Sequence, residues 1–328
     1  MGRFFKKIFG SSGAGSKISD QQQARDAFEE QKPAGLRKDI RMISGCEDAQ
    51  TSADVSNVAS FALPDPAGRA GGACTSTLLR ILYKDDTVPE DDLSYTQVLT
   101  QMRDDLAAQG FTQIPQLTAS NPIDVNTDFD LVPATATGTR RAVMVGINYV
   151  GHNPGELRGC HNDVLNMKKY IIAVHGFEEE NIHVLMDDGE HEEPTRANLI
   201  AAYEKIVAET ESGDAIFLHY SGHGTKLRDD DGDEDDGYDE ALVPLDFKET
   251  GMIRDDDLFD IVCKPLADGA HMVSLMDCCH SGTILDLPYI FKADGSSTQM
   301  QLDDSIDLDG LLQQFGGAAI SFLQNFLG

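Results

Sequence analysis

The clearest structural signal in the sequence is Asp214-Ala-Ile-Phe-Leu-His-Tyr-Ser-Gly-His-Gly224, in which an apolar run leads directly into two glycines and a histidine. Residues 214–220 are mostly apolar and have the length of a fully buried strand. A second stretch, Met272-Val-Ser-Leu-Met-Asp-Cys-Cys-His-Ser-Gly282, repeats this design with a pair of cysteines after the strand. Reactive side chains directly after a strand are typical of open α/β sheets, in which functional residues gather at the carboxyl ends of the strands.

Further strands and helices alternate along this part of the chain. Buried strands are expected at residues 141–148 and 181–186, where apolar residues run together. Helices are expected at residues 160–175 and from a cap at Thr195 through Val207. This alternation predicts an α/β fold with a mostly parallel central sheet, flanked by helices on both faces.

A smaller unit precedes this region. Residues 39–44 are expected to form a strand, and residues 72–83 have the apolar spacing of a helix. Ser94 caps an amphipathic helix that runs to Ala108, and residues 113–117 are interpreted as another strand. The predicted division is a flexible tail at 1–35, a first structured segment at 36–118, a linker at 119–139, a main domain at 140–295 and an extension at 296–328.

The composition limits the classes of function. The chain has 328 residues, with 26 basic and 56 acidic side chains and a net charge of −30, so we expect no nucleic-acid partner. A cationic substrate or bound metal ions fit this charge, and an acidic surface that maintains solubility is the alternative. Six cysteines in a chain of this size do not indicate a disulfide framework. No secretory signal and no apolar run of membrane-spanning length is visible, so we expect a soluble, cytoplasmic monomer.

The N-terminal stretch Met1-Gly-Arg-Phe-Phe-Lys-Lys-Ile-Phe-Gly10 is short, basic and aromatic. One interpretation is contact with an anionic membrane, including myristoylation of Gly2. However, Lys6 stands where that motif has Ser or Thr. We therefore favour a disordered tail, and keep a membrane-associated scaffold as a rival hypothesis.

The histidine and the cysteine pair suit one chemistry. A cysteine peptidase needs a thiolate nucleophile, an imidazole that takes and returns the proton, and backbone N–H groups for the oxyanion. If the two strands are neighbours, His223 and Cys279 emerge at the same edge of the sheet. Gly222 and Gly224 allow the backbone around His223 to approach a substrate closely. The separation of 56 residues (279 minus 223) fits a caspase-like order, in which the histidine lies roughly 50 residues upstream.

In combination, these motifs resemble the metacaspases, relatives of the caspases in plants, fungi and protists. The resemblance covers about residues 140–290. It rests on Ser-Gly-His-Gly and Asp-x-Cys-His-Ser-Gly together with 157–163 (LRGCHND), 237–246 (GYDEALVPLD), 253–258 (IRDDDL) and 286–289 (DLPY). The segment from Ile43 to Asp54 is similar to the small-subunit part that usually follows the catalytic region. Here it comes first, as in the type III metacaspases of algae.

The resemblance implies a role for each matching residue. The nucleophile would be Cys279 and the general base His223, acting through an acyl-enzyme. Metacaspases cut after Arg or Lys, so the chain's partners would be polypeptide substrates with such a residue before the scissile bond. The acidic pocket would be formed by Cys160, Asp163, Ser221 and Asp277, and Ca²⁺ would be the cofactor, bound by Asp239, Asp255, Asp256 and Asp286.

Some alternatives stay open at this stage. Asp163 also suits a helix N-terminus, where a carboxylate interacts well with the helix dipole. Cys278 is interpreted as a buried small residue, with a redox partner as the alternative. Residues 229–240 are strongly acidic but lack the glycine and the bidentate glutamate of an EF-hand, so a solvated loop is the simple interpretation. The alternative function is a catalytically silent calcium-binding regulatory protein on the same fold.

Overall fold

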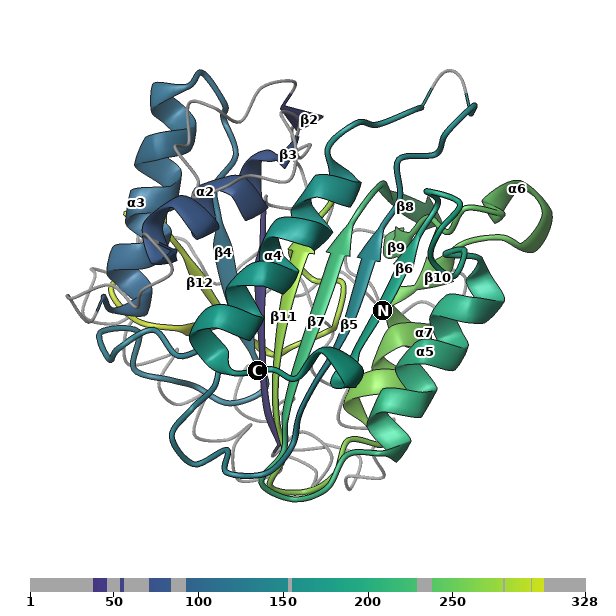
Figure 1. Ribbon diagram of the computed structural model, residues 1–328. Coiled ribbons are helices and arrows are strands. Elements are labelled where there is room, and N and C mark those ends of the chain that lie inside the picture. Colours follow the sequence, from purple (N-terminus) through teal and green to yellow (C-terminus); the bar gives the residue numbers. More distant parts are fainter. Residues whose placement is uncertain are drawn as a thin grey trace, which may run out of the picture. The chain divides into compact units, whose positions relative to one another are not determined.

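A central sheet of eight strands organises the chain in the computed structural model (Figure 1). The structure describes residues 38–45, 54–55, 71–83, 93–152, 155–228, 238–279, 281–295 and 297–303. The strands lie in the order β13 (Gln301–Leu302), β12 (Tyr289–Lys292), β4 (Gln116–Ala119), β1 (Asp39–Ser44), β11 (His271–Asp277), β7 (Ala215–Ser221), β5 (Arg140–Gly146) and β6 (Ile182–Met186).

The sheet is mostly parallel, as the alternation of strands and helices predicts. β1, β11, β7, β5 and β6 all run in the same direction, and β4 is antiparallel to both β1 and β12. Every residue of β7 is buried, as expected for a central strand covered on both faces. The predicted α/β fold with a mostly parallel central sheet is therefore confirmed.

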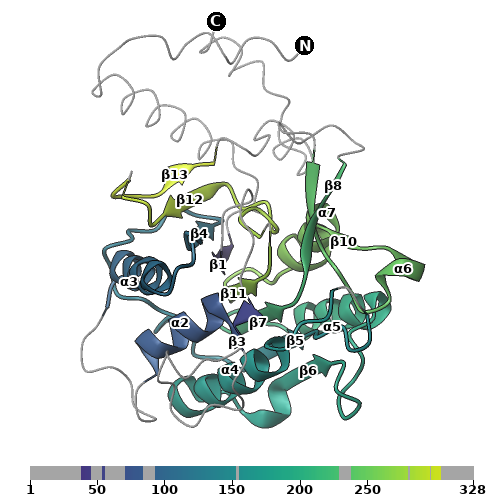
Figure 2. The ribbon, with the colours of Figure 1, turned by 90° about the horizontal axis from the view of Figure 1, so that it is seen from above.

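Helices cover both faces of the sheet. Figure 2 shows α2 (Ala73–Leu82), α3 (Tyr95–Ala108) and α4 (Cys160–His175) on one face, and α5 (Arg196–Ala208) and α7 (Asp255–Leu258) on the other. The other helical elements of the described residues are the 3₁₀ turn η4 (Glu179–Asn181), the short helix α6 (Phe247–Thr250) and the π-helical turn η5 (Phe259–Cys263).

Local sequence explains where these helices begin and end. Ser94 forms a reciprocal capping box with Gln97, so α3 starts where the sequence predicts. The Thr195 side chain accepts the N–H of Asn198 at the start of α5. Gly176 closes α4 in the left-handed conformation at φ 60°, which glycine adopts without steric cost.

The first segment and the main domain share one sheet. β1 lies between β4 and β11, and its residue Asp39 pairs in register with His271. β4 begins later than the predicted strand at 113–117, because Pro115 has no N–H to donate to a ladder. The predicted linker at 119–139 packs against α3, where the N–H of Thr96 donates to the backbone carbonyl of Val125 at 2.9 Å and the side chain of Val125 is buried.

A second, smaller sheet stands at the carboxyl side of β7. It contains β8 (Gly224–Arg228), β9 (Tyr238–Leu242) and β10 (Ile253–Arg254), paired antiparallel in the order β10-β9-β8. A third pair, β2 (Asp54–Val55) with β3 (Gly71–Gly72), precedes α2.

Several predictions concern residues outside the described ranges. These are the N-terminal tail, the small-subunit-like residues 46–53, the acidic residues 229–237 and most of the C-terminal extension. Among the helices that the structure describes, none combines the length and the apolar character that crossing a bilayer requires.

Candidate active site

Strand register brings the predicted dyad to one edge of the sheet. β7 and β11 are parallel neighbours, visible side by side in Figure 1, and Ser221 is the register partner of Asp277. His223 lies two residues beyond Ser221 at the end of β7, and Cys279 lies two residues beyond Asp277 at the end of β11. The two reactive side chains therefore emerge from adjacent strands at equivalent positions.

The imidazole of His223 is oriented by a backbone carbonyl. Its Nε2 lies 2.6 Å from the carbonyl oxygen of Gly155. A carbonyl can only accept a hydrogen bond, so Nε2 carries the proton and Nδ1 is the unprotonated nitrogen. A neutral imidazole in this tautomer presents a base at Nδ1.

The two adjacent cysteines have different environments. Cys278 is 1% exposed, whereas Cys279 is partly exposed. Side chains alternate along an extended segment, which separates the directions of the two thiols. The buried position of Cys278 agrees with its interpretation as a small core residue.

Gly224 is required by the close approach of the two catalytic segments. A Cβ at this position would overlap the carbonyl oxygen of Cys279 and would lie 3.3 Å from the Sγ of Cys278. Only a glycine lets the chain after His223 pass this close to the chain at Cys279.

The residues of the predicted acidic pocket come from β7, β11 and the first turn of α4. The hydroxyl of Ser221 donates to Asp163 Oδ2 at 2.8 Å. A Cβ on Gly72 would overlap the carboxylate of Asp277 and lie 2.8 Å from Asp163 Oδ2, so both carboxylates converge on this glycine. Cys160, the first residue of α4, is also buried.

The start of α2 docks on these two carboxylates. Gly72 N–H donates to Asp163 at 2.7 and 2.8 Å, and Thr75 N–H donates to Asp277 at 2.8 Å. The two acids thereby satisfy N–H groups that the first turn of a helix leaves without intrahelical partners. The pair carries two adjacent carboxylates at one edge of the candidate site, an arrangement that suits a guanidinium or an ammonium.

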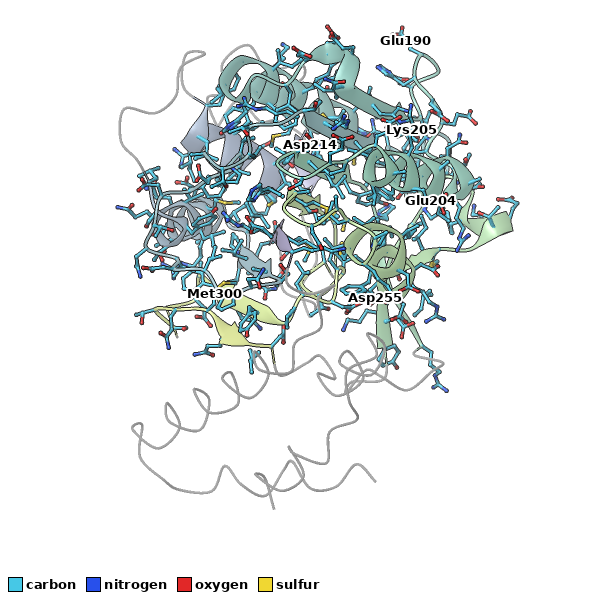
Figure 3. All side chains as sticks on the ribbon, turned by 90° about the horizontal axis from the view of Figure 1, so that it is seen from below. Glu190, Glu204, Lys205, Asp214, Asp255 and Met300 are labelled. Carbon is cyan, nitrogen blue, oxygen red and sulfur yellow. The ribbon has the colours of Figure 1, made fainter. Side chains whose placement is uncertain are left out.

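Three of the four predicted calcium ligands form a cluster. Ligand oxygens of Asp239, Asp255 and Asp256 all lie within 4.8 Å of one another, and Figure 3 labels Asp255 at the start of α7. Asp286 is not a member of this group and lies in the loop after Cys279, with a left-handed backbone at φ 45°.

The electrostatics of this aspartate cluster indicate a deficit of positive charge. Asp239 is buried and pairs with Arg254 through one oxygen, while its buried Oδ1 has no hydrogen-bond partner among the residues that the structure describes. Burial, reinforced by the charge of Glu240, raises the pKa of Asp255 to about 8. An all-carboxylate donor set with an unsatisfied buried oxygen fits a hard cation such as Ca²⁺.

Sequence reasoning missed three groups that the structure brings to the site. Glu240 lies within the quoted motif 237–246 but was given no role, although its N–H donates to Asp255 at 2.6 Å. Tyr149 follows β5, with no local pattern that points to His223. The Gly155 carbonyl leaves no sequence signal at all, because backbone groups have no side-chain identity.

Comparisons with known proteins agree with this architecture. The metacaspase peptidase C14 domain matches residues 140–288, and a caspase domain matches residues 10–126. Metacaspase III c of Phaeodactylum tricornutum is 67% identical over 297 residues, which covers 90% of this chain and 88% of that protein.

Two further relatives match a smaller part of the chain. Metacaspase-1A of Neurospora crassa is 42% identical over 188 residues, covering 57% of this chain and 41% of that protein. Metacaspase-1 of Cryptococcus neoformans is 48% identical over 161 residues, covering 48% of this chain and 35% of that protein. A caspase-like sheet with His223 and Cys279 at neighbouring strand ends, and high identity along nearly the whole length of a known metacaspase, place this chain in the metacaspase family of cysteine peptidases.

Proposed function

We propose that this cysteine peptidase is a calcium-dependent endopeptidase that cleaves after Arg or Lys, with Cys279 as nucleophile and His223 as general base. The observation that carries the proposal is the register pairing of Ser221 with Asp277. Because of this pairing, the segments that carry His223 and Cys279 leave two adjacent parallel strands at the same register position.

The chemistry follows from the tautomer of His223. Nδ1 takes the proton from the Cys279 thiol, and the thiolate attacks the carbonyl carbon of the scissile peptide bond. The tetrahedral intermediate collapses as the imidazolium returns the proton to the leaving amine, which leaves a thioester on Cys279. A water molecule, deprotonated by the same imidazole, then hydrolyses the thioester and releases the acid product. The Gly155 carbonyl stabilises the imidazolium by accepting its Nε2–H throughout.

Specificity for a basic residue is supported by the acidic pocket. Asp163 and Asp277 lie at the catalytic strand ends, where their carboxyl groups converge at short range. A substrate guanidinium or ammonium would neutralise them, whereas a substrate carboxylate would be repelled.

Calcium dependence is supported by the connections of Glu240. Its carboxylate accepts the Thr283 hydroxyl at 2.6 Å, in the loop after Cys279. It also pairs with Lys226 of β8 at 2.9 Å, on the strand that continues from His223. Because Glu240 N–H binds Asp255, an ion held by the aspartate cluster would act on both catalytic segments through one residue. The ion would order the cleft and would not take part in the chemistry.

Hydrolysis of fluorogenic peptides tests the proposal. Peptides that differ only in Arg, Lys or Asp before the scissile bond are compared in free calcium and in excess chelator, with Cys279→Ala as the blank. We expect turnover of the Arg and Lys peptides in calcium only, and magnesium should substitute poorly because it demands a tight octahedron. Comparable hydrolysis of the Asp peptide would refute the pocket assignment.

The double variant Asp255→Ala with Asp256→Ala tests the calcium assignment. It should lose the heat of calcium binding in calorimetry together with the calcium response of hydrolysis. An unchanged calcium response would refute the metal site. Calcium binding without any hydrolysis by the reduced wild type would instead support the silent regulatory protein.

A further inference from the structure

The backbone of His223 is held by two buried tyrosines. Its N–H donates to the hydroxyl of Tyr149 at 2.9 Å, and its carbonyl accepts the hydroxyl of Tyr220 at 2.9 Å. Val243 N–H also donates to that carbonyl at 3.2 Å. Both backbone groups of the histidine are thus hydrogen-bonded, by Tyr220 from its own strand and by Tyr149 and Val243 from two other segments.

The two hydroxyls form a defined hydrogen-bond pattern. Tyr149 is 1% exposed and Tyr220 is fully buried, and burial raises the pKa of both phenols far above the range in which they ionise. Each therefore keeps its proton. Tyr149 donates to the carbonyl of Val243 at 2.6 Å, which leaves its oxygen free to accept from His223.

Tyr149 also contacts the imidazole itself. The two ring centroids are 4.6 Å apart, with an angle of 34° between the planes. This tilted stacking limits rotation of the imidazole, while the Gly155 carbonyl fixes its Nε2. One side chain thus restrains both the backbone and the ring of His223.

The loop that carries Tyr149 is built to hold this conformation. Tyr149 has a left-handed backbone at φ 53°, which is unfavourable for a residue with a bulky side chain. Asp187, at the end of β6, accepts the N–H groups on both sides of it: Asn148 at 2.8 Å and Val150 at 3.0 Å. The carboxylate of Asp187 also binds His161 at 2.6 Å. Strain at one residue that is stabilised by surrounding contacts is a feature of functional sites.

From this geometry we infer that Tyr149 is a positioning residue for His223, and that Asp187 holds Tyr149 in place. The inference rests on the proposed role of His223 as general base. Tyr149 takes no part in the proton transfer itself, and acts by restraining the backbone and the ring of His223. Its loss should lower the fraction of productive thiolate–imidazole pairs and leave substrate affinity unchanged.

The experiment compares Tyr149→Phe with a matched control. Tyr149→Phe keeps the ring and removes only the hydroxyl. The control is Tyr170→Phe, because Tyr170 is also buried and its hydroxyl also contacts a histidine, His175 at 3.0 Å, far from the strand ends that carry the dyad. We expect kcat to fall about 10-fold for Tyr149→Phe, with KM within about 2-fold of the wild type, and no change for the control.

A second readout does not depend on the substrate. The rate of alkylation of Cys279 by iodoacetamide, followed by mass spectrometry of its peptide, reports the thiolate fraction. It should fall in parallel with kcat for Tyr149→Phe. Asp187→Asn, which weakens the hold on the loop, should give a smaller decrease of the same kind and serves as the second variant if Tyr149→Phe fails to fold.

The outcomes separate the inference from the proposed function. If His223→Ala retains hydrolysis, the proposed dyad is wrong. If His223→Ala is inactive but Tyr149→Phe keeps wild-type kcat and alkylation rate, the dyad stands and the positioning role is overturned. A rise in KM with unchanged kcat would also overturn it, because that pattern indicates substrate binding.

Discussion

At the scale of single residues, the packing around the two catalytic segments determines which side chains fit there and which cysteine a substrate can reach. The segments after His223 and at Cys279 approach so closely that position 224 has no room for a side chain. Next to the nucleophile, Cys278 is buried and Cys279 is partly exposed. Adjacent residues of the same type thus differ in access to a substrate.

We predict that Gly224→Ala will lower kcat/KM by about 100-fold, since a misplacement of about 1 Å in an active site has an effect of this size. The added methyl group would overlap the Cys279 carbonyl and push the nucleophile away from His223. Gly110→Ala is the control, because within the described part of the chain no atom beyond the two neighbouring residues lies within 4 Å of its Cβ position. It should lose some stability from its φ of +87° and keep full activity. A fully active Gly224→Ala enzyme would contradict the packing argument.

The two cysteines give a second prediction. Cys279→Ala should abolish hydrolysis, because it removes the nucleophile. Cys278→Ala should retain most activity, because this buried side chain is not the nucleophile. Peptide hydrolysis in reducing buffer measures both. If Cys278→Ala abolished hydrolysis and Cys279→Ala did not, the nucleophile would be Cys278.

At the scale of elements, the sequence predicts what depends on local patterns. The buried strands β7 and β11 and the helices α4 and α5 appear where apolar runs and caps place them. The strand β8 was not expected, because its partly exposed residues give no clear alternation, and β10 has only two residues, too few for a pattern.

For the site, the sequence points to His223, Cys279 and the acids, all of which carry a recognisable side-chain motif. It cannot point to the Gly155 carbonyl or to Tyr149, because these contacts depend on how separate loops pack in three dimensions. Likewise, the separation of Asp286 from the aspartate cluster follows from the path of the loop after Cys279. No residue type specifies such a path.

The central strand β7 carries a buried histidine with a measurable effect on stability. His219 is 1% exposed, and its Nε2 lies 3.3 Å from the Thr75 hydroxyl. Burial lowers its pKa from 6.5 to about 3. Below about pH 6.5 the unfolded chain therefore binds a proton at His219 that the folded chain does not bind. The free energy of unfolding is highest above that pH and decreases as the pH falls below it.

We predict that His219→Gln removes this dependence. The free energy of unfolding of the wild type, relative to that of the variant, should decrease by about 2 kcal/mol between pH 7 and pH 5. Urea unfolding of both proteins at the two pH values measures the difference. Parallel pH profiles would show that His219 is protonated in the folded protein.

At the scale of the whole molecule, the two segments form one structure. β1 and β4 from the first segment complete the sheet beside β11, the strand that leads to Cys279. α2 from the same segment docks on Asp163 and Asp277. The first segment therefore supplies both a central strand and a wall of the candidate pocket.

The main segment should accordingly fail to function alone. Residues 140–328 expressed without the preceding part would expose the edge of β11 and the apolar surface under α2, so we expect an aggregated or inactive product. Solubility, circular dichroism and peptide hydrolysis of this fragment test the prediction. Restored activity after co-expression with residues 36–139 would support it further, whereas a soluble and fully active fragment would contradict it.

The position of β1 also sets the order in which the enzyme can assemble during synthesis. β1 leaves the ribosome early, but its parallel neighbour β11 follows 232 residues later, as measured between Asp39 and His271. Contacts of such long range make folding slow and leave strand edges open in the meantime. Because β11 precedes Cys279 directly, the sheet closes only as the nucleophile itself is translated. A nascent chain that ends before β11 therefore lacks both the parallel neighbour of β1 and the nucleophile.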